Sequence, residues 1–134
     1  MTRQAISTSN APAALAAYSQ AIRSGDMVFC AGQLGIDPAT GEFAEGGIEA
    51  KTERALKNLA AVLDAAGLSF DDVVKTTCFL ADINDFNAFN GVYIKFLADP
   101  PPARSTFQVG ALPRGARVEI EAIARRVQVD AVAR

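Results

Sequence analysis

The sequence predicts an α+β fold in which two helices cover one face of a mixed sheet of about six strands. Short strand-like runs occupy the N-terminal part of the chain, two segments with helical periodicity lie in the middle, and strand-like alternation returns near the C-terminus. Two helices can cover only one face of such a sheet, which gives a two-layer sandwich. A length of 134 residues suits one core, and no linker or repeat divides the chain, so residues 1–134 are interpreted as one domain.

The N-terminal strands are predicted from short apolar runs and one turn signal. Residues 3–8 suit a short edge strand. Residues 18–23 and 27–32 flank Ser24-Gly25-Asp26, whose composition is typical of a hairpin turn. Residues 33–41 are rich in turn-forming types, so a loop is expected there.

Two helices are predicted from the spacing of apolar residues. From Ile48 to Ala66 apolar side chains recur along one stripe, and Gly67 is placed to end this helix. The second helix begins near Asn84 or Asp85, either of which can cap it. Its apolar face carries side chains that we interpret as core and not as a stacking platform: Phe86, Phe89, Tyr93, Phe96 and Leu97.

The sheet face without helices is expected to carry apolar residues. Residues 73–81 are rich in Val and Thr and are expected to form a central strand. Val73 and Phe79 of this strand, together with Ile123, are expected on the uncovered face. Antiparallel sheets often leave one face solvated, but these side chains favour burial against another subunit.

The stretch from Pro100 to Arg126 is predicted to be a β-hairpin with Leu112-Pro113-Arg114-Gly115 as its turn. Period-two alternation places Arg104 and Thr106 on one side of the first strand. On this interpretation Arg104 shares its face with Glu121. The apolar residues of both strands then face one core: Phe107, Val109, Val118, Ile120 and Ala122.

Composition excludes several classes of function. The net charge of −2 and the pI of about 5.1 argue against a nucleic-acid partner, and no apolar run approaches the roughly 20 residues of a membrane span. The N-terminus lacks the apolar core of a signal peptide, so a cytoplasmic protein is expected. Because the chain has no histidine, Ser-His-Asp and Cys-His triads are excluded, and no residue spacing predicts a metal site. Cys30 and Cys78 lie in apolar runs and are expected to be buried thiols.

Arg104 and Glu121 are the strongest candidates for chemistry. The guanidinium of Arg104 can hold a carboxylate through two hydrogen bonds, or it can form a structural ion pair with Glu121 or Glu119. In a chain without histidine, Glu121 is the carboxylate that can orient a water molecule. The alternative is that Glu119 and Glu121 only solvate an outer face.

Three further residues allow a functional and a structural interpretation. Tyr18 can wall a pocket or serve as a core residue with a solvated hydroxyl. Gly32 can let a ligand approach the backbone, or it can mark a β-bulge. Asn90 lies in a helix that otherwise shows aromatic residues and can simply face solvent.

Short motifs along nearly the whole chain resemble the Rid (YjgF-type) family, whose members are reactive enamine/imine deaminases, some of them labelled L-PSP endoribonucleases. The C-terminal motifs are Pro102-Ala103-Arg104-Ser105, Leu112-Pro113 and Val118-Glu119-Ile120-Glu121-Ala122-Ile123-Ala124. The earlier motifs are Asn10-Ala11-Pro12, Tyr18-Ser19-Gln20-Ala21, Gly32-Gln33-Leu34-Gly35, Val74-Lys75-Thr76-Thr77 and Ala81-Asp82-Ile83-Asn84-Asp85-Phe86.

The resemblance implies a chorismate-mutase-like, cofactor-free homotrimer with its sites in the clefts between subunits. It implies that Arg104 grips the substrate carboxylate and that a backbone N–H near Thr106 is a second donor. It also implies positions near the site for Tyr18 and Asn90. At position 106 the relatives often have cysteine, and the backbone role survives that change.

Two departures from the family pattern stand near the expected site. Many members have serine immediately before the Gly-Gln pair, where this chain has Ala31, so one hydroxyl of the substrate-binding site is missing. The Gly-Pro that precedes Tyr-Ser-Gln in the family is replaced by Ala16-Ala17. The second change is expected to alter the loop that carries Tyr18.

These observations lead to the hypothesis of an enzyme that hydrolyses 2-imino acids to 2-keto acids and ammonia. The expected partner is therefore a small imino or keto acid. Two alternatives remain open: an endoribonuclease or translation inhibitor that acts on single-stranded RNA, and a non-catalytic module that binds small carboxylates through Arg104.

Overall fold

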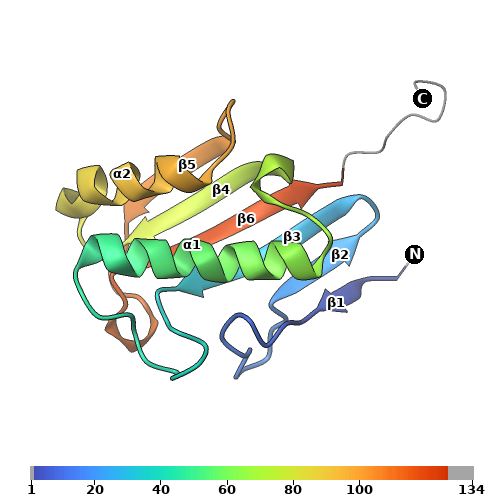
Figure 1. The fold of residues 1–134 in the computed structure, drawn as a ribbon, viewed down its shortest axis with the longest axis horizontal. Helices are drawn as coiled ribbons and strands as arrows, with labels where there is room; N and C mark the ends of the chain where they lie inside the picture. Colours follow the sequence, from blue (N-terminus) through green and yellow to red (C-terminus); the bar gives the residue numbers. More distant parts are fainter. Residues whose placement is uncertain (1, 127–134) are drawn as a thin grey trace.

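A computed structural model describes residues 2–126, in which one six-stranded sheet has the strand order β1-β2-β3-β6-β4-β5. Helices α1 (Ile48–Ala65) and α2 (Phe86–Phe96) lie across the same face of this sheet (Figure 1). The predicted two-layer α+β sandwich is therefore confirmed. The strands are β1 (Gln4–Ile6), β2 (Ala21–Ser24), β3 (Met27–Leu34), β4 (Val73–Leu80), β5 (Ala103–Gln108) and β6 (Val118–Arg125).

The predicted apolar stripe of α1 forms the centre of the core. Gly67 has a φ of 78°, so the expected glycine at the end of this helix is confirmed. None of the helices within residues 2–126 has the length and apolar character needed to cross a membrane. The buried side chains of α1 include Ile48, Thr52, Ala55, Leu56, Leu59, Val62 and Leu63.

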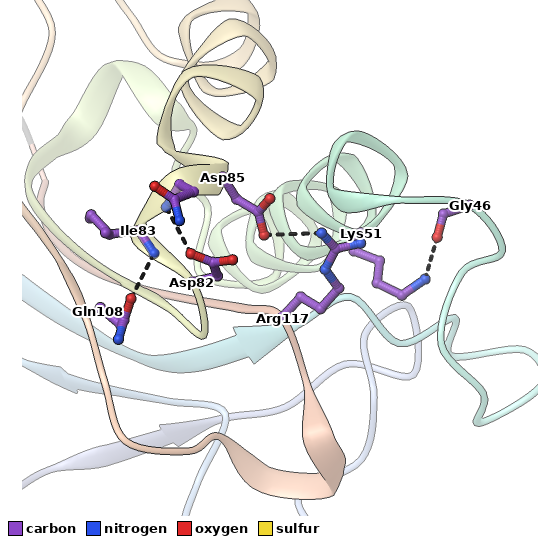
Figure 2. Close-up of polar contacts among 8 residues, drawn as sticks. Gly46, Lys51, Asp82, Ile83, Asp85, Gln108 and Arg117 are labelled. Carbon is purple, nitrogen blue, oxygen red and sulfur yellow. Dashed lines mark hydrogen bonds and ion pairs between the residues drawn. The ribbon is translucent and has the colours of Figure 1, made fainter.

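Polar side chains of α1 hold the loop that follows β3. Asn58 is fully buried, and its Nδ2 donates to the backbone oxygens of Leu34 at 3.1 Å and Ile36 at 2.7 Å. Lys51 Nζ donates to the backbone oxygen of Gly46 at 2.7 Å (Figure 2). A buried amide must find partners, so these bonds explain why a polar residue stands in the middle of the apolar stripe.

The connection from β4 through α2 to β5 is a parallel crossover. β5 pairs in parallel with β4, and β6 lies on the other side of β4, antiparallel to both β4 and β3. The predicted hairpin of β5 with β6 is therefore wrong, because β4 separates the two strands. Period-two alternation identifies the faces of a strand but not its partner. Residues 109–117 also form a connection longer than a tight hairpin turn.

This pairing puts Arg104 and Glu121 on opposite faces of the sheet. Arg104 is level with Thr76, which is level with Ala122, and both neighbours are buried on the helix side. Glu121 is level with Thr77, one residue further along β4, where side chains point to the other face. The prediction that Arg104 and Glu121 share a face is therefore wrong.

Two expectations about apolar residues are also wrong. Phe107 does not join the helix-side core: its side chain is 44% exposed, and its ring meets that of Phe79 edge to face at 5.3 Å. Val73 does not lie on the uncovered face but is buried in the core. The register of β4 against β6 shifts between Val73 and Lys75, and this irregularity reverses the alternation that the sequence suggests.

The sheet face without helices, here called the open face, is nevertheless partly apolar. Phe79 and Ile123 lie on it and are half-buried, as the sequence predicts. Phe29, paired with Ile123, is 45% exposed on the same face. Such a patch on a sheet is a feature of surfaces that contact other molecules.

The turn that leads into α2 is held by β5 and β6 (Figure 2). The Asp82 side chain accepts the backbone N–H of Asn84 at 2.9 Å, and Asp85 forms an ion pair with Arg117 at 3.0 Å. Gln108 Oε1 accepts another backbone N–H of this turn at 2.9 Å. Asp85 is the N-cap residue of α2, as predicted, but its side chain makes no capping hydrogen bond and pairs instead with Arg117, just before β6. The side-chain cap is made one turn earlier, by Asp82.

Gly35→Ala is expected to destabilise the fold. A Cβ at position 35 would lie 2.6 Å from the backbone oxygen of Lys51 in α1, and helix backbone cannot yield as a side chain can. The expected loss is about 1–3 kcal/mol in the free energy of unfolding, measured by urea denaturation. Gly91→Ala is the matched control: it meets no atom within 4 Å and should gain up to about 1 kcal/mol as a better helix former. Wild-type stability in Gly35→Ala would contradict the close approach.

Candidate active site

Arg104 begins the candidate site at the outer edge of the sheet, beneath α2. It is the second residue of β5, and the alternation of that strand points its side chain to the helix side. Its Nη1 donates to Asn90 Oδ1 at 2.7 Å. Its Cζ lies 4.5 Å from the ring centroid of Tyr93, with Phe86 and Phe89 at 5.4 and 5.9 Å. Three aromatic rings and one amide therefore hold the guanidinium.

The structure tests the interpretation of Arg104 as a structural ion pair. No carboxylate within residues 2–126 lies at ion-pair distance from it, and both Glu119 and Glu121 project from the opposite face. The structural ion pair is therefore wrong. A guanidinium has five N–H donors, so donors remain beyond the bond to Asn90. A guanidinium with free donors can take a carboxylate through two hydrogen bonds.

Residues beneath Arg104 fix the aromatic ring on which it rests. The Tyr93 hydroxyl and Thr76 Oγ1 are 2.6 Å apart, and both residues are buried. Burial raises the pKa of Tyr93, so the phenol stays neutral. Cys78 follows on the same face of β4, and burial raises the pKa of its thiol to about 11. For Cys30, burial raises the pKa to about 12, which agrees with the expected buried thiols.

Asn90 and Thr106 lie beside Arg104, as the sequence suggests. Asn90 does not simply face solvent, because it is half-buried and accepts the arginine's hydrogen bond. Thr106 stands two residues along β5 on the same face, level with Cys78 of β4. A side-chain hydrogen bond between these two residues lowers the pKa of the Cys78 thiol, against the larger effect of burial.

Glu121 and Glu119 form a carboxylate pair on the open face. They stand two residues apart on β6, level with Thr77 and Phe79 respectively. Burial raises the pKa of Glu119, and the neighbouring charge of Glu121 raises it further. A Cβ at Gly32 would lie 2.2 Å from Glu119 Oε2, so the carboxylate occupies the space that a side chain there would fill.

Gly32 also marks a β-bulge, which confirms the structural interpretation of this residue. The register of β3 against β6 shifts between Cys30 and Gln33. Ala31, in the bulge, donates its backbone N–H to the Gln20 oxygen at 3.0 Å. Ala31 therefore contributes a backbone hydrogen bond and an apolar methyl group at a position where the family pattern has a side-chain hydroxyl.

Tyr18 lines a cavity of about 450 Å³ together with Gly32. Its side chain is 52% exposed, so the interpretation as a core residue is wrong. The cavity is mostly apolar, and its other walls come from the loop after β3 and from the turn before β6. Lining residues include Pro12, Leu15, Leu34, Ile36 and Pro113.

Within one chain the expected site residues fall into two groups. Arg104, Asn90 and Thr106 lie on the helix side at the edge of the sheet. Glu121 projects from the open face, whereas Gly32 and Tyr18 line the cavity, and Gly32 approaches Glu119. The groups are separated by the sheet. Residues 2–126 contain no group of three or more side chains suited to a metal ion.

Sequence reasoning places Asn90 near the site but misses the aromatic partners of Arg104 on α2. It predicts Tyr93 and the two phenylalanines as core only, and Thr76 as part of a central strand. A signal was available, because Phe86, Phe89, Asn90 and Tyr93 fall on one stripe of a helix. What the sequence did not reveal is that β5 pairs beside β4 under this stripe.

Comparison with known proteins identifies the family of α+β proteins to which this fold belongs. The family model described as Endoribonuclease L-PSP matches residues 8–126. The 2-iminobutanoate/2-iminopropanoate deaminase of Rattus norvegicus is 51% identical over 122 residues, which cover 91% of this chain and 89% of the rat protein. The chain belongs to this family, which is the Rid family that its motifs resemble.

Solved structures agree with this assignment. RidA from an Antarctic Psychrobacter is 47% identical with a TM-score of 0.87, covering 91% of this chain and 98% of that structure. Escherichia coli TdcF, solved with bound serine, is 40% identical with a TM-score of 0.88, covering 92% of this chain and 99% of that structure. The predicted family and fold are therefore confirmed.

Glu119→Gln is expected to change stability in a pH-dependent way. A carboxyl whose pKa is raised on folding stabilises the fold below its ordinary pKa, and this stability is lost as the pH rises through the raised value. The variant keeps the neutral shape at every pH. It should therefore be more stable than wild type at pH 7 and equally stable near pH 4 in urea denaturation. A difference that is the same at both pH values would contradict the perturbed carboxyl.

Proposed function

We propose that this protein hydrolyses 2-imino acids, such as 2-iminobutanoate and 2-iminopropanoate, to 2-keto acids and ammonia. The observation that carries the proposal is Arg104, a half-buried arginine held by Asn90 and aromatic rings and not matched by a carboxylate of residues 2–126. Curated relatives with about half of their residues identical over nine tenths of the chain are named for this reaction. A substrate carboxylate supplies the partner that Arg104 lacks.

The chemistry asks for positioning more than for strong catalysis. Water adds to the electrophilic C=N carbon and a proton passes to the nitrogen, which gives a carbinolamine. A second proton passes from the carbinolamine hydroxyl to the nitrogen, the C=O bond forms as the C–N bond breaks, and ammonia leaves. In this scheme Arg104 holds the carboxylate, Thr106 offers a backbone N–H, and Glu121 orients the attacking water and takes its proton. Tyr18, Gly32 and Asn90 complete the walls of the substrate-binding site. At position 31, where many family members have a serine hydroxyl, this chain has the methyl group of Ala31.

The two groups of residues can meet only if a site takes them from two chains. Arg104 and Glu121 are attached to opposite faces of one sheet, and no loop movement exchanges those faces. The apolar open face offers a surface for a second copy. The resemblance adds the number of copies, so we propose a homotrimer with its sites between subunits.

Two other functions receive less support. A net charge of −2 and a pI of about 5.1 do not favour single-stranded RNA, which binds to basic grooves with aromatic platforms. The aromatic rings of α2 lie under Arg104 and in the core, so they form no such platform. A binding module without catalysis would use the same arginine, and turnover of imine separates it from an enzyme.

Two substitutions test the assigned roles in steady-state assays with an imine-generating enzyme. Arg104→Lys keeps the charge but loses the planar fork, so kcat/KM should fall roughly ten- to a hundredfold and 2-oxobutanoate should bind more weakly. Glu121→Gln should lower kcat and leave 2-oxobutanoate affinity, measured by calorimetry, nearly unchanged. Arg125→Lys and Glu53→Gln, at exposed positions, serve as matched controls. An unchanged kcat in Glu121→Gln would refute its role, and unchanged keto-acid binding in Arg104→Lys would refute the carboxylate grip.

Mixing two inactive variants tests whether the site lies between chains. Chains with Arg104→Ala and chains with Glu121→Gln are unfolded together, refolded and assayed. If each site takes Arg104 from one chain and Glu121 from the next, about one site in four has both native residues, and activity returns to roughly a quarter of wild type. Each variant refolded alone is the control. Activity no higher than in these controls, with trimers confirmed by light scattering, would place both residues in one chain's site or in none.

A further inference from the structure

Tyr93 touches Arg104 but is not among the residues expected to bind substrate. It lies in the middle of α2, is 3% exposed, and places its ring face 4.5 Å from the Arg104 Cζ, closer than Phe86 or Phe89. A guanidinium stacked on a ring keeps its N–H groups in the plane, where they project beyond the ring edge. The ring therefore supports one face of the guanidinium.

The ring itself is held at its far end. The Tyr93 hydroxyl is hydrogen-bonded to Thr76 Oγ1 at 2.6 Å, and Thr76 is fully buried in β4, directly beside Arg104 in β5. Asn90, one turn earlier on α2, holds Nη1 from the side. The contacts form a closed path from β5 to α2 to β4 and back to β5. Such a path restrains the long arginine side chain before any ligand arrives.

We propose that Tyr93, anchored by Thr76, is a positioning residue that orients Arg104 for a ligand carboxylate. The inference rests on the proposed function only for the identity of the ligand, an anion of the 2-keto or 2-imino acid class. Tyr93 does not touch the ligand in this scheme. It acts through Arg104, so its removal lowers carboxylate affinity and raises KM, whereas kcat changes little.

The test measures 2-oxobutanoate binding to the full chain by calorimetry, together with KM and kcat for imine hydrolysis. Tyr93→Leu removes the ring face and should weaken binding about three- to thirtyfold, the range of a cation–π contact, with less than a threefold change in kcat. Phe96→Leu is the matched control. It removes a ring of the same helix, packed against Phe70, and should leave binding within twofold of wild type.

A double substitution shows whether Tyr93 acts through Arg104. In an Arg104→Lys background the planar group that stacks on the ring is gone, so Tyr93→Leu should weaken binding by less than twofold. An equal effect in both backgrounds would show that the ring only supports packing and would overturn the proposal. Wild-type affinity in a folded Tyr93→Leu protein would also overturn it.

Milder variants keep the proposal testable if Tyr93→Leu does not fold. Tyr93→Phe and Thr76→Val keep the ring and release its anchor, and each should weaken binding about two- to fivefold. Wild-type affinity for 2-oxobutanoate in both variants would show that the hydrogen bond between Tyr93 and Thr76 does not contribute to positioning. Calorimetry needs no turnover, so the two proposals fail separately. If the wild type binds keto acid, the Tyr93 variants bind it more weakly and no imine is hydrolysed, only the enzymatic function is refuted. If the wild type hydrolyses imine and the Tyr93 variants bind keto acid equally well, only the positioning role is refuted.

Discussion

The parallel pairing of β5 with β4 is the constraint on which the rest of this structure depends. A parallel pair needs a crossover, and α2 is the crossover element. Its placement on the same side as α1 leaves the other face of the sheet open. The same pairing brings the first turns of α2 over the start of β5, so Arg104 meets Asn90 and Tyr93. The layer order, the open face and the contacts of Arg104 with Asn90 and Tyr93 thus share one cause.

The surroundings of Arg104 show how a fold can hold a charged group at the edge of its core. Arg104 is half-buried, and a guanidinium in such a place needs compensation for lost water. Aromatic faces and one amide oxygen provide it, and neither competes with an incoming carboxylate as an aspartate or glutamate would. On the opposite face, burial raises the pKa of Glu119, and the neighbouring charge of Glu121 raises it further.

The elements could be predicted from sequence far better than their partners. The stripe of α1, the glycine at position 67 and the hairpin of β2 with β3 follow from local spacing and turn chemistry. The pairing of β5 could not be predicted, because a strand's alternation is the same beside any neighbour. The sequence identifies Arg104 and Glu121 as candidate residues. That they lie on opposite faces of the sheet could not be predicted, because it depends on the strand order. Val73 was misplaced because an irregularity in register leaves no mark in a run of valines.

The contact between Gly32 and Glu119 links two positions that are far apart in the chain. The glutamate's carboxylate fills the space where any larger residue at position 32 would begin. A methyl group at position 32 and a long acid at position 119 are therefore mutually exclusive unless the acid swings away. Among homologous proteins the two positions should vary together, with a larger residue at 32 accompanied by a shorter side chain at 119.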